Sequence, residues 1–288
     1  MISLKRNNKT GELVEATGIT SQKWRIYSPN QNKDFQLSRS RFDEFMNCPR
    51  CFYLKVNKGF MSPSTPGWTL NTLTDTLLKK EFDECRVKQE PHRIMITNNL
   101  SHLVPYASEI IKDKKGNDKL LIEEWRDSLH YGIKHRFKDT NIILQGGVDD
   151  VWFNTKTKEL VIADYKSQHK KEDVLQETYF NDPYKKGYQR QLDYYAYVLK
   201  GMGYPVSEDA YFYICNAKEV DEGFHGKMLF DEVLIHYKIK TDYLEDEIQK
   251  MIDVMNSTKI PNSHESCENC AYARQRSAID KLGGSDEK

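Results

Sequence analysis

The chain has 288 residues, of which 38% are hydrophobic and 30% charged, the composition of a globular protein long enough for a sizeable core. Lys+Arg and Asp+Glu both number 43, so bulk charge does not indicate a nucleic-acid partner. No stretch approaches the ~18 apolar residues of a membrane helix, and the N-terminus lacks the apolar core of a signal peptide. We therefore expect a cytoplasmic protein with no membrane partner.

The first 35 residues are polar and rich in Asn, which predicts an N-terminal arm, either irregular or a short hairpin. Residues 1–60 hold 11 Lys+Arg against 5 Asp+Glu, so this part of the chain is basic. Because phosphate contacts depend on where charges lie, two interpretations stay open. The basic region is either a solvated surface or one that contacts a nucleic-acid backbone.

Helical and strand patterns alternate along the rest of the chain. The first helix is expected after a capping serine, Ser38 or Ser40. A loop rich in Pro, Gly and Ser (59–67) separates it from a second helix at 68–86. The apolar side of this second helix is expected to contain Leu70, Leu73, Leu77, Leu78 and Phe82.

Residues 91–140 are ambiguous, with short strand-like runs and one helix near 120–132. A helix at 184–203 ends in glycines, and its expected core stripe is Leu192, Tyr195, Ala196 and Leu199. The remaining segments are strands at 208–217 and 227–239, a helix at 242–257 and a disordered tail at 276–288. This alternation predicts one α/β domain over residues 36–275.

The segment "GGVDDVWFNTKTKELVIADYKS" (146–167) has apolar runs around a polar centre, the pattern of a β-hairpin. If the turn is centred between residues 156 and 157, Asp149 lies opposite Asp164 with Cβ atoms about 5 Å apart. Lys166 lies two residues beyond Asp164 and projects from the same face. Two carboxylates and one ammonium group are thus expected on one side of an otherwise apolar hairpin.

This convergence has two interpretations. One is an Asp–Lys salt bridge on a solvated sheet face. The other follows from the mostly apolar run "ELVIADYKS", which indicates a strand covered on both faces. A buried pair of carboxylates is typical of a hard-cation site with oxygen ligands, such as Mg²⁺ or Mn²⁺. Asp150 should point away from Asp149, so we leave it out of this site.

The order of three motifs resembles the PD-(D/E)XK nucleases, over residues 36–275. G-x-x-D (146–149) comes before a strand that ends in D-x-K (164–166), and a helix with Q-x-x-x-Y (191–195) follows. The most similar branch is the RecB-like one, which includes AddB-type helicase–nucleases and CRISPR-associated exonucleases. The resemblance implies an α/β, restriction-endonuclease-like fold, in which a single domain has a mixed β-sheet core flanked by helices.

The resemblance also implies roles for these residues. Asp149 and Asp164, with the backbone carbonyl of Tyr165, would hold one or two Mg²⁺ or Mn²⁺ ions that lower the pKa of a bound water. Lys166 would orient or help to deprotonate the attacking water and add positive charge near the scissile phosphate. Gln191 would reach toward that water or toward Lys166.

Several residues near Gln191 in the sequence can each be interpreted in two ways. Tyr195 shares the helix face of Gln191, so it is either a catalytic residue or an ordinary core aromatic. Lys185, Lys186 and Arg190 either contact nucleic-acid phosphates or form a solvated start of the helix.

The RecB-like branch carries a further helix with G-x-x-x-H upstream of the hairpin. This chain has "NTLTD" at that place, with Asn71 where the branch has Gly and Asp75 where it has His. We therefore expect Asp75 to complete the catalytic metal site, since an Asp can ligate a metal as His does. Glu81 is the competing candidate.

Two C-x-x-C pairs lie near opposite ends of the chain, at Cys48 and Cys51 and at Cys267 and Cys270. Four thiolates in two such pairs predict a shared metal, and the spacing alone favours structural Zn²⁺. The resemblance instead implies a 4Fe–4S cluster, which in several RecB-like nucleases is held by one upstream and three downstream cysteines. Arg276 stands where the third downstream ligand belongs, so Cys51 would replace it.

Together these patterns predict a Mg²⁺- or Mn²⁺-dependent deoxyribonuclease, with DNA as its partner and a separate helicase or delivery protein as a second one. By resemblance, the substrate is single-stranded DNA or DNA ends, and the enzyme is an exonuclease. One alternative is a metal-stapled binding module with an inactive nuclease site. A thiol oxidoreductase is disfavoured because no βαβ pattern surrounds the C-x-x-C pairs, and the remaining Cys85 and Cys215 lie in apolar patterns as expected of buried thiols.

Overall fold

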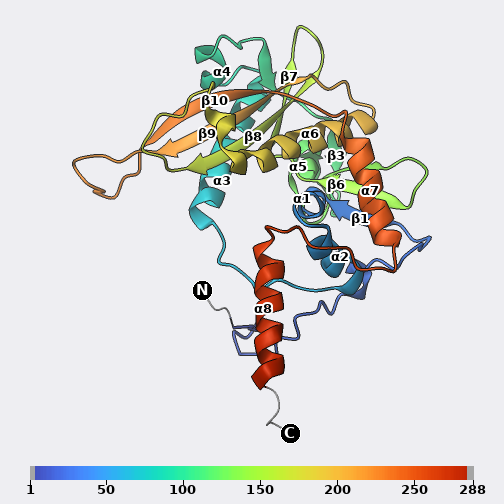
Figure 1. The fold of residues 1–288 in the computed structure, drawn as a ribbon. Coiled ribbons are helices and arrows are strands. Elements are labelled where there is room, and N and C mark those ends of the chain that lie inside the picture. The colour runs from blue at the N-terminus through green and yellow to red at the C-terminus, as the bar shows by residue number, and fades with distance from the viewer. Residues whose placement is uncertain (1–3, 284–288) are drawn as a thin grey trace. The chain divides into compact units, whose positions relative to one another are not determined.

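A computed structural model describes residues 4–283 of the chain (Figure 1). The chain forms two compact units, each assembled from separate stretches of the sequence. Unit 1 contains Met1–Phe35, Ser40–Gly67 and Glu245–Lys288, and unit 2 contains Gln36–Arg39 and Trp68–Leu244. No helix among residues 4–283 is both long enough and apolar enough to span a membrane.

A five-stranded sheet forms the centre of unit 2, in the order β10-β9-β8-β7-β2. Strands β8 and β9 are parallel, and the other neighbours are antiparallel, so the sheet is mixed. This confirms the predicted fold class of a mixed sheet with flanking helices. The strands are β2 (Leu103–Pro105), β7 (Asp150–Asn154), β8 (Leu160–Gln168), β9 (Asp209–Ala217) and β10 (Phe230–Lys238).

Strands β7 and β8 form the predicted hairpin. Phe153 pairs with Leu160 and Asp150 pairs with Ala163, which is the register expected from a turn centred between residues 156 and 157. Asn154 stabilises the turn, because its Oδ1 accepts two backbone N–H groups of the following residues. Extended by one pair, this register places Asp149 opposite Asp164.

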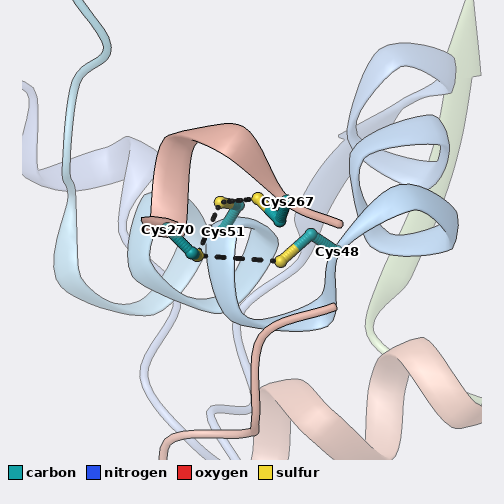
Figure 2. A group of neighbouring side chains, drawn as sticks. All are labelled: Cys48, Cys51, Cys267 and Cys270. Carbon is teal, nitrogen blue, oxygen red and sulfur yellow. Dashed lines mark hydrogen bonds between the residues drawn. The ribbon is translucent and has the colours of Figure 1, made fainter. Parts of the chain in front are cut away.

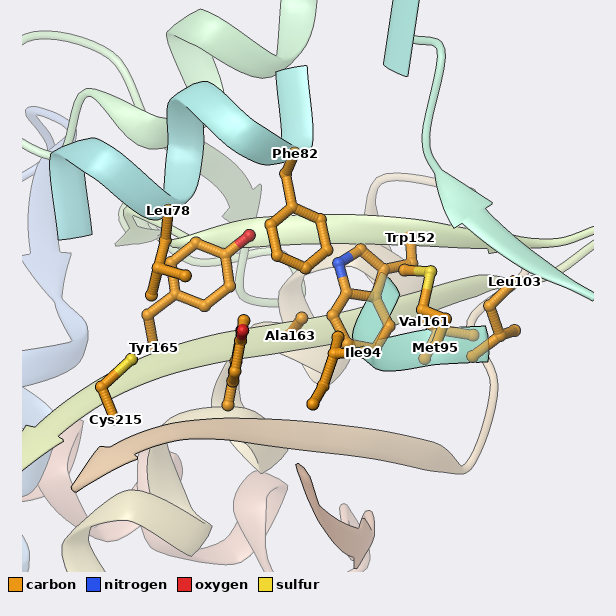
Figure 3. Close-up of a cluster of buried hydrophobic side chains, with 11 residues drawn as sticks. Leu78, Phe82, Ile94, Met95, Leu103, Trp152, Val161, Ala163, Tyr165 and Cys215 are labelled. Carbon is orange, nitrogen blue, oxygen red and sulfur yellow. The ribbon is translucent and has the colours of Figure 1, made fainter. Parts of the chain in front are cut away.

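Helix α3 (Thr69–Lys88) packs on one face of the sheet through Leu78 and Phe82. Figure 3 shows these two side chains directed from α3 toward the strands, where they meet the cluster formed with Trp152, Val161, Ala163 and Tyr165. The predicted apolar side of this helix is partly wrong. Three of its expected members are more than half exposed: Leu70, Leu73 and Leu77.

Helix α6 (Lys186–Gly201) packs against the sheet at β8 and against a second, three-stranded sheet. Its predicted core stripe is confirmed, with all four members buried: Leu192, Tyr195, Ala196 and Leu199. The second sheet has the order β1-β6-β5 and consists of β1 (Phe35–Ser38), β5 (Ile133–Arg136) and β6 (Ile142–Gly146).

The ambiguous region at 91–140 folds into short elements joined by turns, which is why no single periodicity marked it. It contains β2 and β5 together with α4 (Arg93–Thr97), β3 (Ile110–Lys112), β4 (Asp118–Leu120) and α5 (Leu121–Arg126). Two 3₁₀ turns precede α6, at Tyr179–Asn181 and Pro183–Lys185.

Unit 1 is helical. Pro49 starts α2 (Pro49–Lys58) and separates it from α1 (Arg39–Asn47), so the first predicted helix is broken in two. Helix α7 (Leu244–Asn256) meets the N-terminal arm, since Tyr27 donates a hydrogen bond to Asn256. The arm itself contains one 3₁₀ turn, Lys23–Arg25, and an isolated bridge between Arg6 and Leu13.

The last helix, α8 (Glu268–Gly283), corrects the predicted tail. Residues 276–283 continue this helix, so the disordered segment expected from 276 does not begin there. The polar composition misled the prediction, because a helix can be polar on most of its surface. The remainder of the predicted tail, 284–288, lies outside the described residues.

Candidate active site and cysteine cluster

Asp164 lies within β8 and is fully buried. Its two carboxylate oxygens have different partners: Nε2 of Gln191 donates to Oδ1 at 2.6 Å, and the ammonium group of Lys166 forms an ion pair with Oδ2. The Asp–Lys salt bridge of the first interpretation is present, but the solvated sheet face that went with it is wrong, because this part of β8 is covered on both sides. Residues 160–165 of the strand are all buried.

Asp149 lies in the link between β6 and β7 and turns toward Asp164. Its Oδ2 accepts the backbone N–H of Tyr165 at 2.9 Å, which fixes the carboxylate beside the neighbouring strand. Burial raises the pKa of Asp164 to about 7, the charge of Lys166 opposes this rise, and the charge of Asp149 adds to it. The two aspartates are thus close enough to affect each other electrostatically.

Asp75 on α3 lies beside the same pair. Its Oδ2 accepts a hydrogen bond from Lys79 at 2.7 Å, and the same ammonium group lies 4.0 Å from Oδ1 of Asp149. Burial raises the pKa of Asp75, and Asp149 adds to that rise. Glu81 points elsewhere, since its Oε2 lies 3.1 Å from Nε2 of His92. The structure thus brings Asp75, and not Glu81, to the two aspartates.

These three aspartates, Asp75, Asp149 and Asp164, form what we term the carboxylate cluster. Two ammonium groups, of Lys79 and Lys166, contact these three carboxyl groups. Oδ1 of Asp75 is buried and has no hydrogen-bond partner among residues 4–283. A buried oxygen without a donor, beside two further carboxylates, fits a hard divalent cation such as Mg²⁺ or Mn²⁺.

Tyr195 connects Gln191 to the G-x-x-D motif. Nε2 of Gln191 lies 3.3 Å from the Tyr195 hydroxyl, and the Tyr195 ring packs on Gly146. A Cβ atom at Gly146 would lie 2.5 Å from Cε1 of that ring, so the close approach requires glycine. Tyr195 therefore contributes to both packing and site geometry, and its burial raises the pKa of the phenol to about 12.

Lys185 lies near Lys166. The Nζ atoms of Lys185 and Lys166 both lie 4.8 Å from the centre of the Tyr188 ring, and Lys185 also donates to Oε1 of Gln168 at 3.1 Å. Burial lowers the pKa of Lys185, and the charge of Lys166 adds to this effect. Two cationic groups therefore share one aromatic side chain at the edge of the site.

The other two predicted phosphate contacts lie further along α6. Lys186 is exposed, and Arg190 is half-buried. The charge of Arg190 acts on the phenol of Tyr243. Of the three basic residues predicted at this helix start, the structure thus connects only Lys185 to Lys166.

A buried ionic network behind Asp149 was missed by the sequence analysis. Nε of Arg126 donates to the backbone carbonyl of Asp149 at 3.1 Å, and its guanidinium also binds Oδ1 of Asp150 at 3.0 Å. Arg86 pairs with the same oxygen at 2.5 Å, and the Tyr165 hydroxyl donates to Oδ2. Asp150 is directed away from the carboxylate cluster as predicted, but it helps to hold the backbone of Asp149 through Arg126.

Lys79 was also missed, although the sequence contains a signal for it. It follows Asp75 by four residues on a helix, a spacing at which side chains of opposite charge meet. Arg126 gives no such signal, because its approach to Asp149 depends on how α5 packs against β7.

Four of the six cysteines meet in unit 1, and all six are free thiols (Figure 2). The sulfur atoms of Cys48, Cys51, Cys267 and Cys270 lie within 4.8 Å of one another and form the four-cysteine cluster. Cys51 lies 3.5 Å from Cys267 and 3.4 Å from Cys270, and Cys48 lies 3.9 Å from Cys270. The predicted shared metal site is thus supported by the positions of its four thiols.

Two helices begin at this cluster. Cys48 is the N-cap residue of α2, and Cys267 immediately precedes α8. Burial disfavours the thiolate of Cys48, yet backbone N–H groups of Cys51 and His264 donate to its sulfur and lower its pKa to about 7. Burial raises the pKa of Cys51 and of Cys270, so an ion that binds all four sulfurs must offset the cost of ionising these two thiols.

The mixed sheet, with a D-x-K strand and a carboxylate cluster beside it, defines an α/β nuclease. The chain belongs to the PD-(D/E)XK nuclease superfamily, whose family model matches residues 36–275. This match extends over segments of both units. Members of the superfamily are phosphodiester hydrolases that use divalent metals, so the chain is a nuclease at this level of description.

Among solved structures, the chain is similar to one named "Putative exonuclease" from Eubacterium rectale. The two are 14% identical with a TM-score of 0.40, and the similarity covers 89% of this chain and 94% of the other. A comparison with curated protein sequences finds no match.

Proposed function

We propose that this protein is a Mg²⁺- or Mn²⁺-dependent deoxyribonuclease that hydrolyses phosphodiester bonds. One observation carries the proposal: the link before β7, the strand β8 and the helices α3 and α6 bring three carboxylates, one lysine and one glutamine together. The residues are Asp75, Asp149, Asp164, Lys166 and Gln191.

The carboxylate cluster would hold one or two divalent ions. Such an ion, when bound, supplies Lewis-acid activation of the attacking water and neutralises charge on the phosphate. Lys166 keeps a charged ammonium group in the site, because the charges of Asp164 and Asp149 raise its pKa against the effect of burial. It can therefore orient the nucleophile and stabilise the extra negative charge of the transition state.

Gln191 has a positioning role in this proposal. Its amide donates to one oxygen of Asp164 while Lys166 pairs with the other, so the carboxylate has a defined orientation. Tyr195 supports that amide from the same helix face. A ligand held in this way does not need to reorganise when the metal binds.

The proposed substrate is single-stranded DNA or DNA ends, with exonuclease action. The resemblance to the RecB-like branch supports this choice. Lys185 lies beside Lys166 and would contact a neighbouring phosphate, and Lys186 and Arg190 would extend the basic track along α6. Neutral net charge indicates modest affinity for DNA. We therefore propose that a helicase or other delivery protein presents the DNA to the nuclease. The proposed setting is DNA repair in the cytoplasm.

The test is cleavage of end-labelled single-stranded DNA, double-stranded DNA and single-stranded RNA of one sequence, with Mg²⁺, Mn²⁺ or EDTA. We expect DNA to shorten progressively from one end with either metal and to stay intact with EDTA. Asp164→Asn should abolish the reaction. Asp139→Asn, the same change at an exposed turn, should leave it unchanged.

Each outcome has a distinct meaning. Cleavage that survives in Asp164→Asn would remove the carboxylate cluster from the mechanism. Cleavage of RNA alone would overturn the choice of substrate. Binding of DNA without cleavage by the metal-loaded wild type would favour the alternative, a binding module with an inactive site.

A further inference from the structure

The spacing of sulfur atoms in the four-cysteine cluster distinguishes between the two metal centres that its ligands allow. Four thiolates around a single tetrahedral ion, with metal–sulfur bonds of about 2.3 Å, lie about 3.8 Å apart. Three of the sulfur–sulfur distances are 3.4, 3.5 and 3.9 Å, and no pair exceeds 4.8 Å. These values bracket the distance expected for one ion.

A 4Fe–4S cluster needs a wider cage. Each of its four thiolates binds a different iron, so every sulfur–sulfur distance is longer than around one ion by roughly an iron–iron separation. Four sulfurs that all lie within 4.8 Å leave no space for a cube of irons and sulfides between them. The cysteine pattern also argues against a 4Fe–4S cluster, because Arg276 occupies the position of the third downstream cysteine.

We infer that the four-cysteine cluster holds one tetrahedral Zn²⁺ ion in place of the 4Fe–4S cluster that the resemblance implies. Four protein thiolates complete a tetrahedron and leave no open position, which is the arrangement of a structural zinc site. All four coordination positions are then filled by thiolates, and no position is left for a water or substrate, so we assign the site no catalytic role.

The surroundings suit the charge of such a centre. One Zn²⁺ with four thiolates carries two net negative charges. Helices α2 and α8 both begin at the cluster, and the positive ends of their dipoles stabilise negative charge there. The two helix N-termini therefore suit the negative charge of a zinc–thiolate centre.

This inference is independent of the proposed nuclease function. All four cysteines belong to unit 1, whereas the carboxylate cluster belongs entirely to unit 2. A failure of one assignment would therefore leave the other untouched, because metal content and cleavage are measured separately.

The test is the metal and sulfide content of the full-length protein, produced with both iron and zinc supplied and purified without oxygen. We expect one zinc per chain, no acid-labile sulfide and a colourless solution. About four irons and four sulfides per chain, with brown absorbance, would overturn the inference. One iron without sulfide would overturn the choice of zinc, and a chain without metal would overturn the site itself.

Two further measurements keep the test informative even if a cysteine variant misfolds. Exchange of the native metal for Co²⁺ in the wild type should give the intense visible bands of tetrahedral cobalt with sulfur ligands, and weak octahedral bands would contradict the geometry. Cys267→Ser should lose the zinc, whereas Cys85→Ser, the same change in helix α3 outside the cluster, should keep it. Equal zinc in both variants would overturn the ligand assignment.

Discussion

Gln191 donates a 2.6 Å hydrogen bond to Oδ1 of Asp164, from helix α6 to strand β8. The other oxygen of the same carboxylate pairs with Lys166, so both of its oxygens are oriented by the protein. Because Asp164 is fully buried, water does not take over this task when a partner is removed. The orientation of the Asp164 carboxylate thus depends on Gln191 and Lys166 together.

Replacing Gln191 should therefore impair metal use more than folding. We expect Gln191→Ala to slow cleavage about 10- to 100-fold and to raise the Mg²⁺ concentration needed for half-maximal rate. Gln189→Ala, on the same helix two residues earlier, is the control and should behave like the wild type. A titration of rate against Mg²⁺ measures both effects, and an unchanged Mg²⁺ requirement in Gln191→Ala would refute the positioning role.

Lys166 supplies the ammonium group nearest to Asp164. We expect Lys166→Ala to reduce the cleavage rate by about 10²- to 10⁴-fold, since both positioning and transition-state charge stabilisation are lost. The fold should persist, which circular dichroism can verify. Lys156→Ala, in the exposed β7–β8 turn, is the matched control. Full activity in Lys166→Ala would remove this residue from the mechanism.

Asp75 and Glu81 compete for the same role on helix α3, and only Asp75 approaches Asp149. We expect Asp75→Asn to lower the cleavage rate at limiting Mg²⁺ by about tenfold or more, because an oxygen ligand loses its charge. Glu81→Gln should retain activity, since its partner is His92. If the two variants gave the opposite pattern, Glu81 would be the metal ligand.

We expect Asp150 to contribute to the stability of the fold and not to catalysis. It is fully buried against Arg86, which is itself 2% exposed, and against Arg126. Asp150→Asn leaves these cations without their counter-charge and should lower the free energy of unfolding by about 3–5 kcal/mol. Asp173→Asn, at an exposed position, should change it by less than about 0.5 kcal/mol. Urea denaturation compares the two, and equal midpoints would contradict the network.

Cys48 links the metal site to the stability of unit 1. We expect Cys48→Ala to lower the melting temperature by on the order of 10 °C and to reduce metal content, because a structural metal stabilises only the folded chain. Cys85→Ala removes a half-buried thiol outside the cluster and is the control. An unchanged melting temperature together with a full metal complement in Cys48→Ala would show that this sulfur is not a ligand.

The features predicted well from the sequence depend on local chemistry. The register of the β7–β8 hairpin follows from a polar turn held by Asn154 and from the alternation on either side. The stripe on α6 follows from helical periodicity. In both cases, neighbours in sequence determine the geometry, so the pattern alone was sufficient.

The features that the sequence did not reveal depend on contacts between distant segments. Leu70 and Leu73 match helical periodicity, but both side chains are more than half exposed. Arg86 lies on the same helix and is buried, since Asp150 supplies its counter-charge. Arg126 reaches Asp149 only through the packing of α5 against β7. Periodicity carries no information about such partners.

The discontinuous sequence of unit 1 has a consequence for synthesis in the cell. The ribosome completes every member of the carboxylate cluster by residue 164, but the second pair of thiols emerges only at Cys267 and Cys270. All four cysteines can therefore bind one metal ion only after residue 270 has been synthesised. A chain that stopped between residues 245 and 266 would carry the complete carboxylate cluster with half of the metal ligands. Metal binding by the four-cysteine cluster would thus follow the synthesis of the whole carboxylate cluster.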